Sequence, residues 1–179
     1  MSPLLLLIAG SIRHGSVSDA VVRTATTLTS ANHVARAYGE THLLPHFNPA
    51  LEGSHLPGAV ARLRSTFAGA DAFMFCTPEY AGALPGALKN LLEWAIGGCM
   101  YQKPAGWINT ATAPTGAARA HDSLRTVLNY TGALTIPDAC VRIPVNRASV
   151  TPVGLISDGT TRADIAAALE TLSAAVTKR

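Results

Sequence analysis

Residues 3–18 read Pro-Leu-Leu-Leu-Leu-Ile-Ala-Gly-Ser-Ile-Arg-His-Gly-Ser-Val-Ser. The uninterrupted apolar run over residues 3–9 predicts a strand that is buried on both faces, as the inner strands of parallel sheets are. The next nine residues are small, carry several hydroxyl groups and one arginine, and precede a helical pattern. The first amide groups of a helix have no partners within it, so this turn predicts a phosphate site at a helix start. An ordinary strand-to-helix turn capped by serine is the alternative.

Strand and helix patterns alternate along the rest of the chain. We predict strands at residues 3–9, 34–38, 72–76, 105–110 and 139–145. Helices are predicted at residues 18–30, from 57, at 85–96, between 116 and 132, and at 161–176. Such alternation implies an α/β fold with helices on both faces of a parallel sheet. Five strands fit the flavodoxin-like order 2-1-3-4-5, in one three-layer domain over residues 1–179.

Ligands of such sheets bind beyond the carboxyl ends of the strands, at the point where the strand order reverses. The loops to inspect are therefore residues 10–18 and 77–84, with 111–116 beside them. The second loop reads Thr-Pro-Glu-Tyr-Ala-Gly-Ala-Leu. Pro78 stiffens it, its backbone amides and carbonyls can read the polar edge of a planar ring, and Tyr80 offers an aromatic wall. Taken alone, this loop is equally compatible with a purely structural turn.

The composition bears on several classes of function. Apolar residues make up 48% of the chain and charged residues 14%, with a net charge of +3, which argues against a disordered protein. The arginines are scattered, which argues against a nucleic-acid surface. The three cysteines form no Cys-x-x-Cys pair and favour the cytoplasm. No apolar run approaches the roughly 20 residues of a membrane span. No metal site is predicted, because Pro45 separates His42 from His46 and breaks any helical spacing between them.

The first two loops together resemble the NADPH-dependent FMN reductases of the flavodoxin-like superfamily, which include quinone, azo-dye and chromate reductases. That family shows Gly-Ser-x-Arg-x-x-Ser-x-Asn after its first strand, and residues 10–18 match this pattern except that Ser18 replaces the asparagine. After its third strand the family shows Pro-Glu-Tyr-Asn and Pro-Gly-x-Leu-Lys-Asn. Residues 78–81 read Pro-Glu-Tyr-Ala, so that Ala81 replaces an asparagine, and residues 85–90 match. The resemblance spans roughly residues 3–132.

The resemblance implies bound FMN, with NADPH or NADH as the electron donor. It implies that the FMN phosphate is held by Ser11, Arg13, Ser16 and Ser18 together with the amide of Val17. The isoalloxazine ring and ribityl chain would contact the second loop at Pro78, Glu79, Tyr80 and Ala81. The ring would be flanked on its other side by the third loop, at Thr112, Ala113 and Gly116. Hydride would pass from the nicotinamide to flavin N5, so no protein side chain is assigned a catalytic role.

The resemblance further implies a small-molecule electron acceptor, such as a quinone, free flavin, azo compound or metal oxyanion. It implies a homodimer or homotetramer, because the active site of the family lies near a subunit contact. A non-catalytic FMN carrier of the flavodoxin type is the alternative, although such carriers tend to be acidic and the sequence pI is about 9.0. A flavin-free domain that binds partners is a third interpretation, which Ala81 keeps open.

Overall fold

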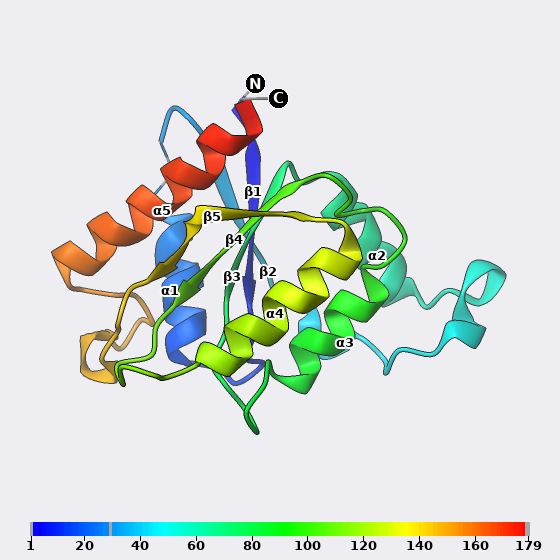
Figure 1. The fold of residues 1–179 in the computed structure, drawn as a ribbon, viewed down its shortest axis with the longest axis horizontal. Coiled ribbons are helices and arrows are strands. Elements are labelled where there is room, and N and C mark those ends of the chain that lie inside the picture. Colours follow the sequence, from blue (N-terminus) through cyan, green and yellow to red (C-terminus); the bar gives the residue numbers. More distant parts are fainter. Residues whose placement is uncertain (1, 29, 178–179) are drawn as a thin grey trace.

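The computed structural model describes residues 2–28 and 30–177, which form a five-stranded sheet and five α-helices (Figure 1). The strands are β1 (Leu4–Ala9), β2 (Val34–Tyr38), β3 (Ala72–Cys76), β4 (Pro104–Asn109) and β5 (Leu134–Arg142). They lie in the order β2-β1-β3-β4-β5, and every neighbouring pair is parallel. The predicted flavodoxin-like α/β fold is therefore confirmed.

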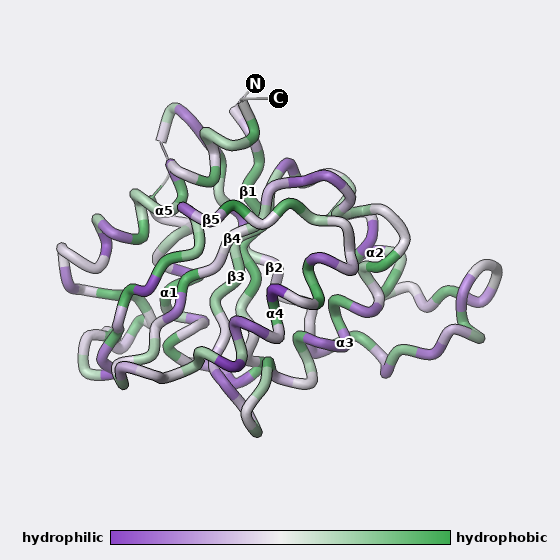
Figure 2. The backbone as a smooth tube through the Cα atoms, viewed as in Figure 1, coloured by the Kyte–Doolittle hydropathy of each residue, from purple (hydrophilic) through white to green (hydrophobic). Residues whose placement is uncertain are grey.

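Helices cover both faces of the sheet: α1 (Val17–Thr26) and α5 (Gly159–Thr177) on one, and α2 (Gly58–Ala68), α3 (Gly86–Trp94) and α4 (Ala118–Thr131) on the other (Figure 1). Successive side chains of a strand point to opposite faces, and β1 shows this division. Leu6 and Ile8 belong to the core under α2, α3 and α4, whereas Leu5 and Leu7 belong to the core under α1 and α5. The inner strands β1 and β3 are accordingly hydrophobic along most of their length (Figure 2). Within the described ranges, no helix is long and apolar enough to cross a membrane.

The last strand begins earlier than the sequence pattern predicts. We expected residues 139–145, but β5 starts at Leu134 and is interrupted by a bulge. Ala105 pairs with Thr135 and Trp107 with Cys140, so the four residues 136–139 oppose the single residue Gly106. The bulge breaks the period-2 pattern that would have identified the first half of the strand.

The first helix ends earlier than predicted, at Thr26 rather than near residue 30. The hydroxyl groups of Thr26 and Thr27 donate to the carbonyl oxygens of Arg23 and Thr24, each at 2.7 Å. Threonine is a weak helix former because its branched side chain loses freedom in a helix and competes for backbone hydrogen bonds. Ser30 already belongs to a short bridge with His33, and Thr29 lies outside the described residues.

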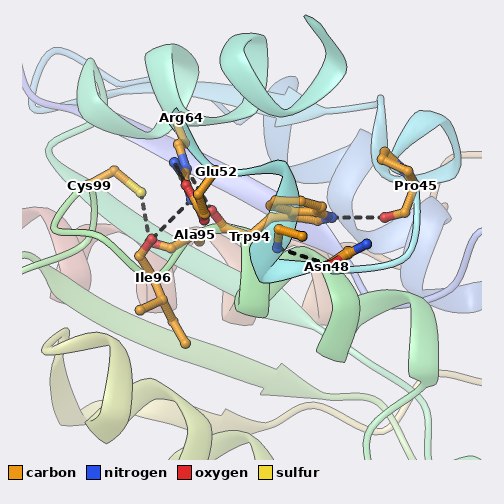
Figure 3. Close-up of polar contacts among 9 residues, drawn as sticks. Pro45, Asn48, Glu52, Arg64, Trp94, Ala95, Ile96 and Cys99 are labelled. Carbon is orange, nitrogen blue, oxygen red and sulfur yellow. Dashed lines mark hydrogen bonds and ion pairs between the residues drawn. The ribbon is translucent and has the colours of Figure 1, made fainter. Parts of the chain in front are cut away.

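The long connection between β2 and α2 is anchored by side chains of neighbouring helices (Figure 3). Trp94 Nε1 donates to the carbonyl oxygen of Pro45 at 2.8 Å, and Asn90 Nδ2 donates to the same oxygen at 2.9 Å. Farther along, Arg64 donates to both carboxylate oxygens of Glu52, at 2.8 and 2.7 Å. Asn90, the last residue of the Pro-Gly-Ala-Leu-Lys-Asn stretch, therefore fixes the course of this connection.

Candidate functional site

Three loops meet beyond the carboxyl ends of the inner strands, at the edge that is lowest in Figure 1: residues 10–16, 77–85 and 110–117. The first two are joined directly, because the amide of Gly10 donates to the carbonyl oxygen of Cys76 at 2.8 Å. Ser11 Oγ and the Tyr80 hydroxyl also share a hydrogen bond of 3.2 Å. Only glycine fits at position 10, since a Cβ atom there would lie 2.5 Å from Thr77 Cβ and overlap its hydroxyl. The predicted meeting of these loops is therefore observed.

The first loop ends in a serine-capped helix. Ser16 is the N-cap of α1, and its hydroxyl accepts a hydrogen bond of 3.1 Å from the amide of Asp19. Ser11 Oγ accepts a bond of 3.2 Å from the amide of Arg13, which folds the loop back on itself. The amides of Val17 and Ser18 are the first two of the helix, for which the helix itself offers no acceptors. The exposed Arg13 lies in the same loop, so a guanidinium and these amide donors belong to one turn.

Ser18 is buried, as Ser11 and Ser16 are. Its side chain is only 3% exposed and is hydrogen-bonded to the thiol of Cys76 at the end of β3. Burial raises the pKa of that thiol to about 12, so it stays protonated. The hydroxyl of Ser18 thus ties α1 to the sheet, and only its backbone amide is left to face an anion.

The second loop contains a tight turn that the sequence did not reveal. Tyr80 and Ala83 exchange two backbone hydrogen bonds of 3.0 Å, and the two residues between them, Ala81 and Gly82, have φ values of 51° and 74°. This is the pattern of a type I′ turn, for which Asn-Gly is the favoured central pair. Alanine in the left-handed region costs roughly 1–2 kcal/mol. Ala81 therefore differs from the asparagine of the family pattern in two ways: it lacks a polar side chain, and it is less suited to the left-handed backbone conformation.

Glu79 connects the second loop to the third. Its Oε2 atom accepts a hydrogen bond of 3.2 Å from the amide of Ala120, in the first turn of α4. The N-cap position of α4 is Ala117, which has a φ of 58° and no capping side chain. The Glu79 carboxylate takes over that function, and a negative charge at a helix N-terminus is also favourable. Its side chain is therefore committed to structure.

The third loop is braced from two sides. Asn109 Oδ1 accepts from the amide of Ala111 at 3.0 Å, and Asn109 Nδ2 donates to the carbonyl oxygen of Gly116 at 3.3 Å. Arg142, at the end of β5, donates through Nη2 to the carbonyl oxygens of residues 111–113 at 3.3, 3.2 and 2.9 Å. The carbonyls of this loop are thereby held by Arg142.

Arg147 adds a second cation beside the first loop. It lies in the short 3-10 helix η4 (Arg147–Ser149), and its Nη1 atom donates to the carbonyl oxygen of Gly15 at 3.0 Å. Arg142 and Arg147 were both missed by the sequence analysis, because the loops that they contact lie far from them in the sequence. A charged residue at the carboxyl end of a parallel strand is the one signal that could have found Arg142.

A cavity of about 280 Å³ adjoins the first loop on the side of β2. Its walls include Ser11, Arg13, Tyr38 and His42. Burial raises the pKa of the Tyr38 hydroxyl to about 12, with a smaller contribution from the negative charge of Glu40. The hydroxyl therefore remains a neutral donor, and within the described part of the chain it has no hydrogen-bond partner.

The sequence over residues 3–146 matches the model of a known family, described as NADPH-dependent FMN reductase. The chain belongs to this family. An NAD(P)H-dependent FMN reductase of Pseudomonas aeruginosa is 32% identical over 129 residues, which are 70% of this chain and 69% of that protein. A quinone reductase of Pseudomonas putida is 28% identical over 144 residues, 77% of this chain and 73% of that protein.

Among solved structures, the flavoenzyme NAD(P)H:(acceptor) oxidoreductase FerB from Paracoccus denitrificans has the same fold, with a TM-score of 0.85 over 98% of both chains at 24% identity. Family and fold agree with the loop geometry. This NADPH-dependent FMN reductase family member is an FMN-dependent oxidoreductase that uses NAD(P)H and a small-molecule acceptor. An enzymatic function is thereby favoured over that of a non-catalytic FMN carrier.

Proposed function

We propose that the three loops hold FMN, with its phosphate on the first loop and its ring between the second and third, and that electrons pass from NADPH or NADH to a quinone or similar acceptor. The observation that carries this proposal is the donor set at the start of α1. Two hydroxyl groups, two unshared helix amides and two guanidinium groups lie at one turn.

At the phosphate end, the residues present fit a dianion. Arg13 supplies a charge from within the loop, while Arg147 adds a second one beside Gly15. Ser11 and Ser16 offer hydroxyl groups, and the amides of residues 17 and 18 offer donors. Hydrogen bonds to a charged group contribute roughly 1.5–3 kcal/mol each, and the helix terminus adds about 0.3–1 kcal/mol. Ser18 contributes its amide alone, because its hydroxyl is bonded to Cys76.

At the ring end, backbone groups do most of the binding. Pro78, Glu79, Tyr80 and Ala81 present their main chain to one side, since the Glu79 carboxylate is engaged at α4. On the other side, Arg142 holds the carbonyls of residues 111–113, which leaves the amides of Thr112 and Ala113 for the polar edge of the ring, with Gly116 closing the turn. Bound FMN supplies the hydride chemistry. The protein's own residues orient the ring and control access to it.

The acceptor, the assembly and the location belong to the same proposal. Relatives named quinone reductases support a quinone as the acceptor. Tyr80 and Ile12, which are 48% and 56% exposed in the loops of the site, support a homodimer or homotetramer with a subunit contact nearby. The three free cysteines support a cytoplasmic location. The continuous sheet supports one domain over residues 1–179.

An anaerobic titration tests the proposal. The purified chain is saturated with FMN, its visible spectrum is recorded, and NADPH is added without oxygen, followed by a quinone. We expect the flavin absorbance to bleach with NADPH and to return with the quinone. A bound flavin that stays oxidised would indicate a carrier, and failure to bind any flavin would contradict the whole proposal.

A further inference from the structure

A larger cavity, of about 490 Å³, is lined by residues of β4, α4 and β5. Figure 1 shows α4 on the face of the sheet that also carries α2 and α3. Trp107 and His121 form the buried wall of the cavity, each only 5% exposed. Arg125 and Asp122 form an exposed rim on α4. Its size lies within the range of ligand pockets, which hold about 300–1,000 Å³. The first two loops of the candidate site contribute nothing to it.

The bulge in β5 shapes this cavity. Residues 136–139 oppose Gly106 alone, and Pro137 within that segment lines the hollow together with Thr135 and Cys140 on either side. Bulges often stand next to binding sites, because they bend the strand and redirect its side chains. The irregularity that hid the start of β5 from the sequence pattern therefore opens a concave surface.

Two polar atoms in residues of this cavity are left unsatisfied. His121 Nε2 and Thr135 Oγ1 are buried, and neither has a hydrogen-bond partner among the described residues. The Nδ1 atom of His121 donates to the carbonyl oxygen of Ala117 at 2.6 Å, so Nε2 is an acceptor in the neutral ring. Burial lowers the pKa of this histidine and keeps it neutral. Buried polar groups without protein partners are ordinarily satisfied by a ligand or by water.

The remaining surface of the cavity is apolar and positively charged. The Arg125 guanidinium lies 5.3 Å from the centre of the Trp107 ring, and Arg142 stands at the opposite rim. Among the described residues that line the cavity, Asp122 is the single acid, 3.5 Å from Arg125, so the two arginines leave a net positive charge. The cavity thus has an unpaired acceptor and hydroxyl just behind its walls, an aromatic wall, and cations at its mouth.

We propose that this cavity is a second ligand site, which binds a small aromatic carboxylate that also carries a hydroxyl group. The hydroxyl would donate to His121 Nε2 after a small adjustment of the wall, the ring would lie against Trp107 and Pro137, and the carboxylate would face Arg125. None of these four residues belongs to the three loops of the proposed flavin site, whereas Arg142 at the rim also holds the carbonyls of the third loop.

Tryptophan fluorescence of the whole chain tests the proposal, with 4-hydroxybenzoate as the probe. The chain has two tryptophans, Trp94 and Trp107, and only Trp107 lines the cavity. We expect a saturable change of emission that is lost in Trp107→Phe, with the same affinity in FMN-free and FMN-saturated protein. Benzoate, without the hydroxyl, and phenol, without the carboxylate, should each bind about tenfold more weakly. This titration succeeds or fails irrespective of whether FMN binds.

Two variants with matched controls complete the test. Arg125→Gln should weaken 4-hydroxybenzoate about tenfold, whereas Arg36→Gln on the exposed edge strand should have no effect. Thr135→Val should raise the thermal midpoint, because a methyl group replaces a buried hydroxyl without a partner; Thr160→Val at an exposed site should not. The proposal is overturned if no saturable change occurs, which would indicate a cavity filled by water only. It is equally overturned if the signal survives in Trp107→Phe, or if Thr135→Val lowers the midpoint.

Discussion

The turn at Ala81 and Gly82 allows a sharp test of how the second loop is held. Ala81 is exposed and has a φ of 51°, so its side chain makes no packing contribution that a substitution would remove. The left-handed conformation costs an alanine roughly 1–2 kcal/mol. Asparagine tolerates this conformation far better and glycine adopts it freely. Ala81→Asn restores the Asn-Gly pair that such turns favour.

The expected gain can be worked out for both substitutions. Ala81→Gly relieves the whole strain of about 1–2 kcal/mol but loses about 0.5–1 kcal/mol, because glycine has more freedom in the unfolded chain. Its net gain therefore lies between about 0 and 1.5 kcal/mol. We expect a gain of similar size for Ala81→Asn, because asparagine keeps a Cβ atom and does not add the conformational freedom that glycine gives the unfolded chain. In a chain of this length, 1 kcal/mol corresponds to about 2–4 °C in the thermal midpoint.

Chemical denaturation of the flavin-free protein measures both effects. The matched control is Ala61, which is exposed in the middle of α2. Ala61→Gly should lose about 1 kcal/mol, because glycine is a poor helix former, and Ala61→Asn should lose stability as well. Opposite signs at the two alanines are the expected result. If both substitutions at Ala81 were destabilising, as at Ala61, the turn would not impose a left-handed conformation in solution and the reasoning would be wrong.

Three further predictions follow from single contacts. Gly10→Ala should lower the free energy of unfolding by about 1–3 kcal/mol, the usual cost of overpacking, and the double variant Gly10→Ala with Thr77→Ala should recover part of that loss. Denaturant titrations measure both changes. Full stability of Gly10→Ala would refute the close approach of residue 10 to Thr77. Glu79→Ala should cost about 0.5–2 kcal/mol, as loss of a helix cap does, while Glu79→Gln should retain most of the hydrogen bond to Ala120; equal losses would show that charge alone matters. Burial raises the pKa of the Cys76 thiol to about 12 in the folded state, whereas an ordinary thiol has a pKa of about 8.5. As the pH rises above about 9, the unfolded chain therefore loses this proton while the folded chain keeps it. Stability should therefore fall above that pH by up to about 1.4 kcal/mol per pH unit for this group, and Cys76→Ala should flatten the fall; an unchanged slope would contradict the burial argument.

The sequence predicted what depends on neighbouring residues. The apolar run at residues 3–9, a serine cap at the start of the first helix and the alternation of strands and helices are local signals, and all of them appear in the structure. The meeting of the first two loops follows from strand order alone. These features needed no knowledge of distant contacts.

What the sequence could not supply depends on residues far apart in the chain. Arg142 reaches a loop about 30 positions earlier and Arg147 reaches Gly15 across 132 positions. The inward bond of the Ser18 hydroxyl depends on Cys76 lying beside it. The left-handed turn could not be predicted, because Ala81 occupies the position where asparagine would have indicated a type I′ turn.

The central claim is that the first loop binds the phosphate group of FMN, and a comparison of FMN with riboflavin tests it most directly. The two ligands share the ring and the ribityl chain and differ in the phosphate alone. Fluorescence titration of Arg13→Ala should show FMN binding weakened by about 10- to 100-fold, the equivalent of one charged hydrogen bond. Riboflavin should bind the variant as it binds the unaltered chain. Equal losses for the two ligands, or no loss for FMN, would contradict the account.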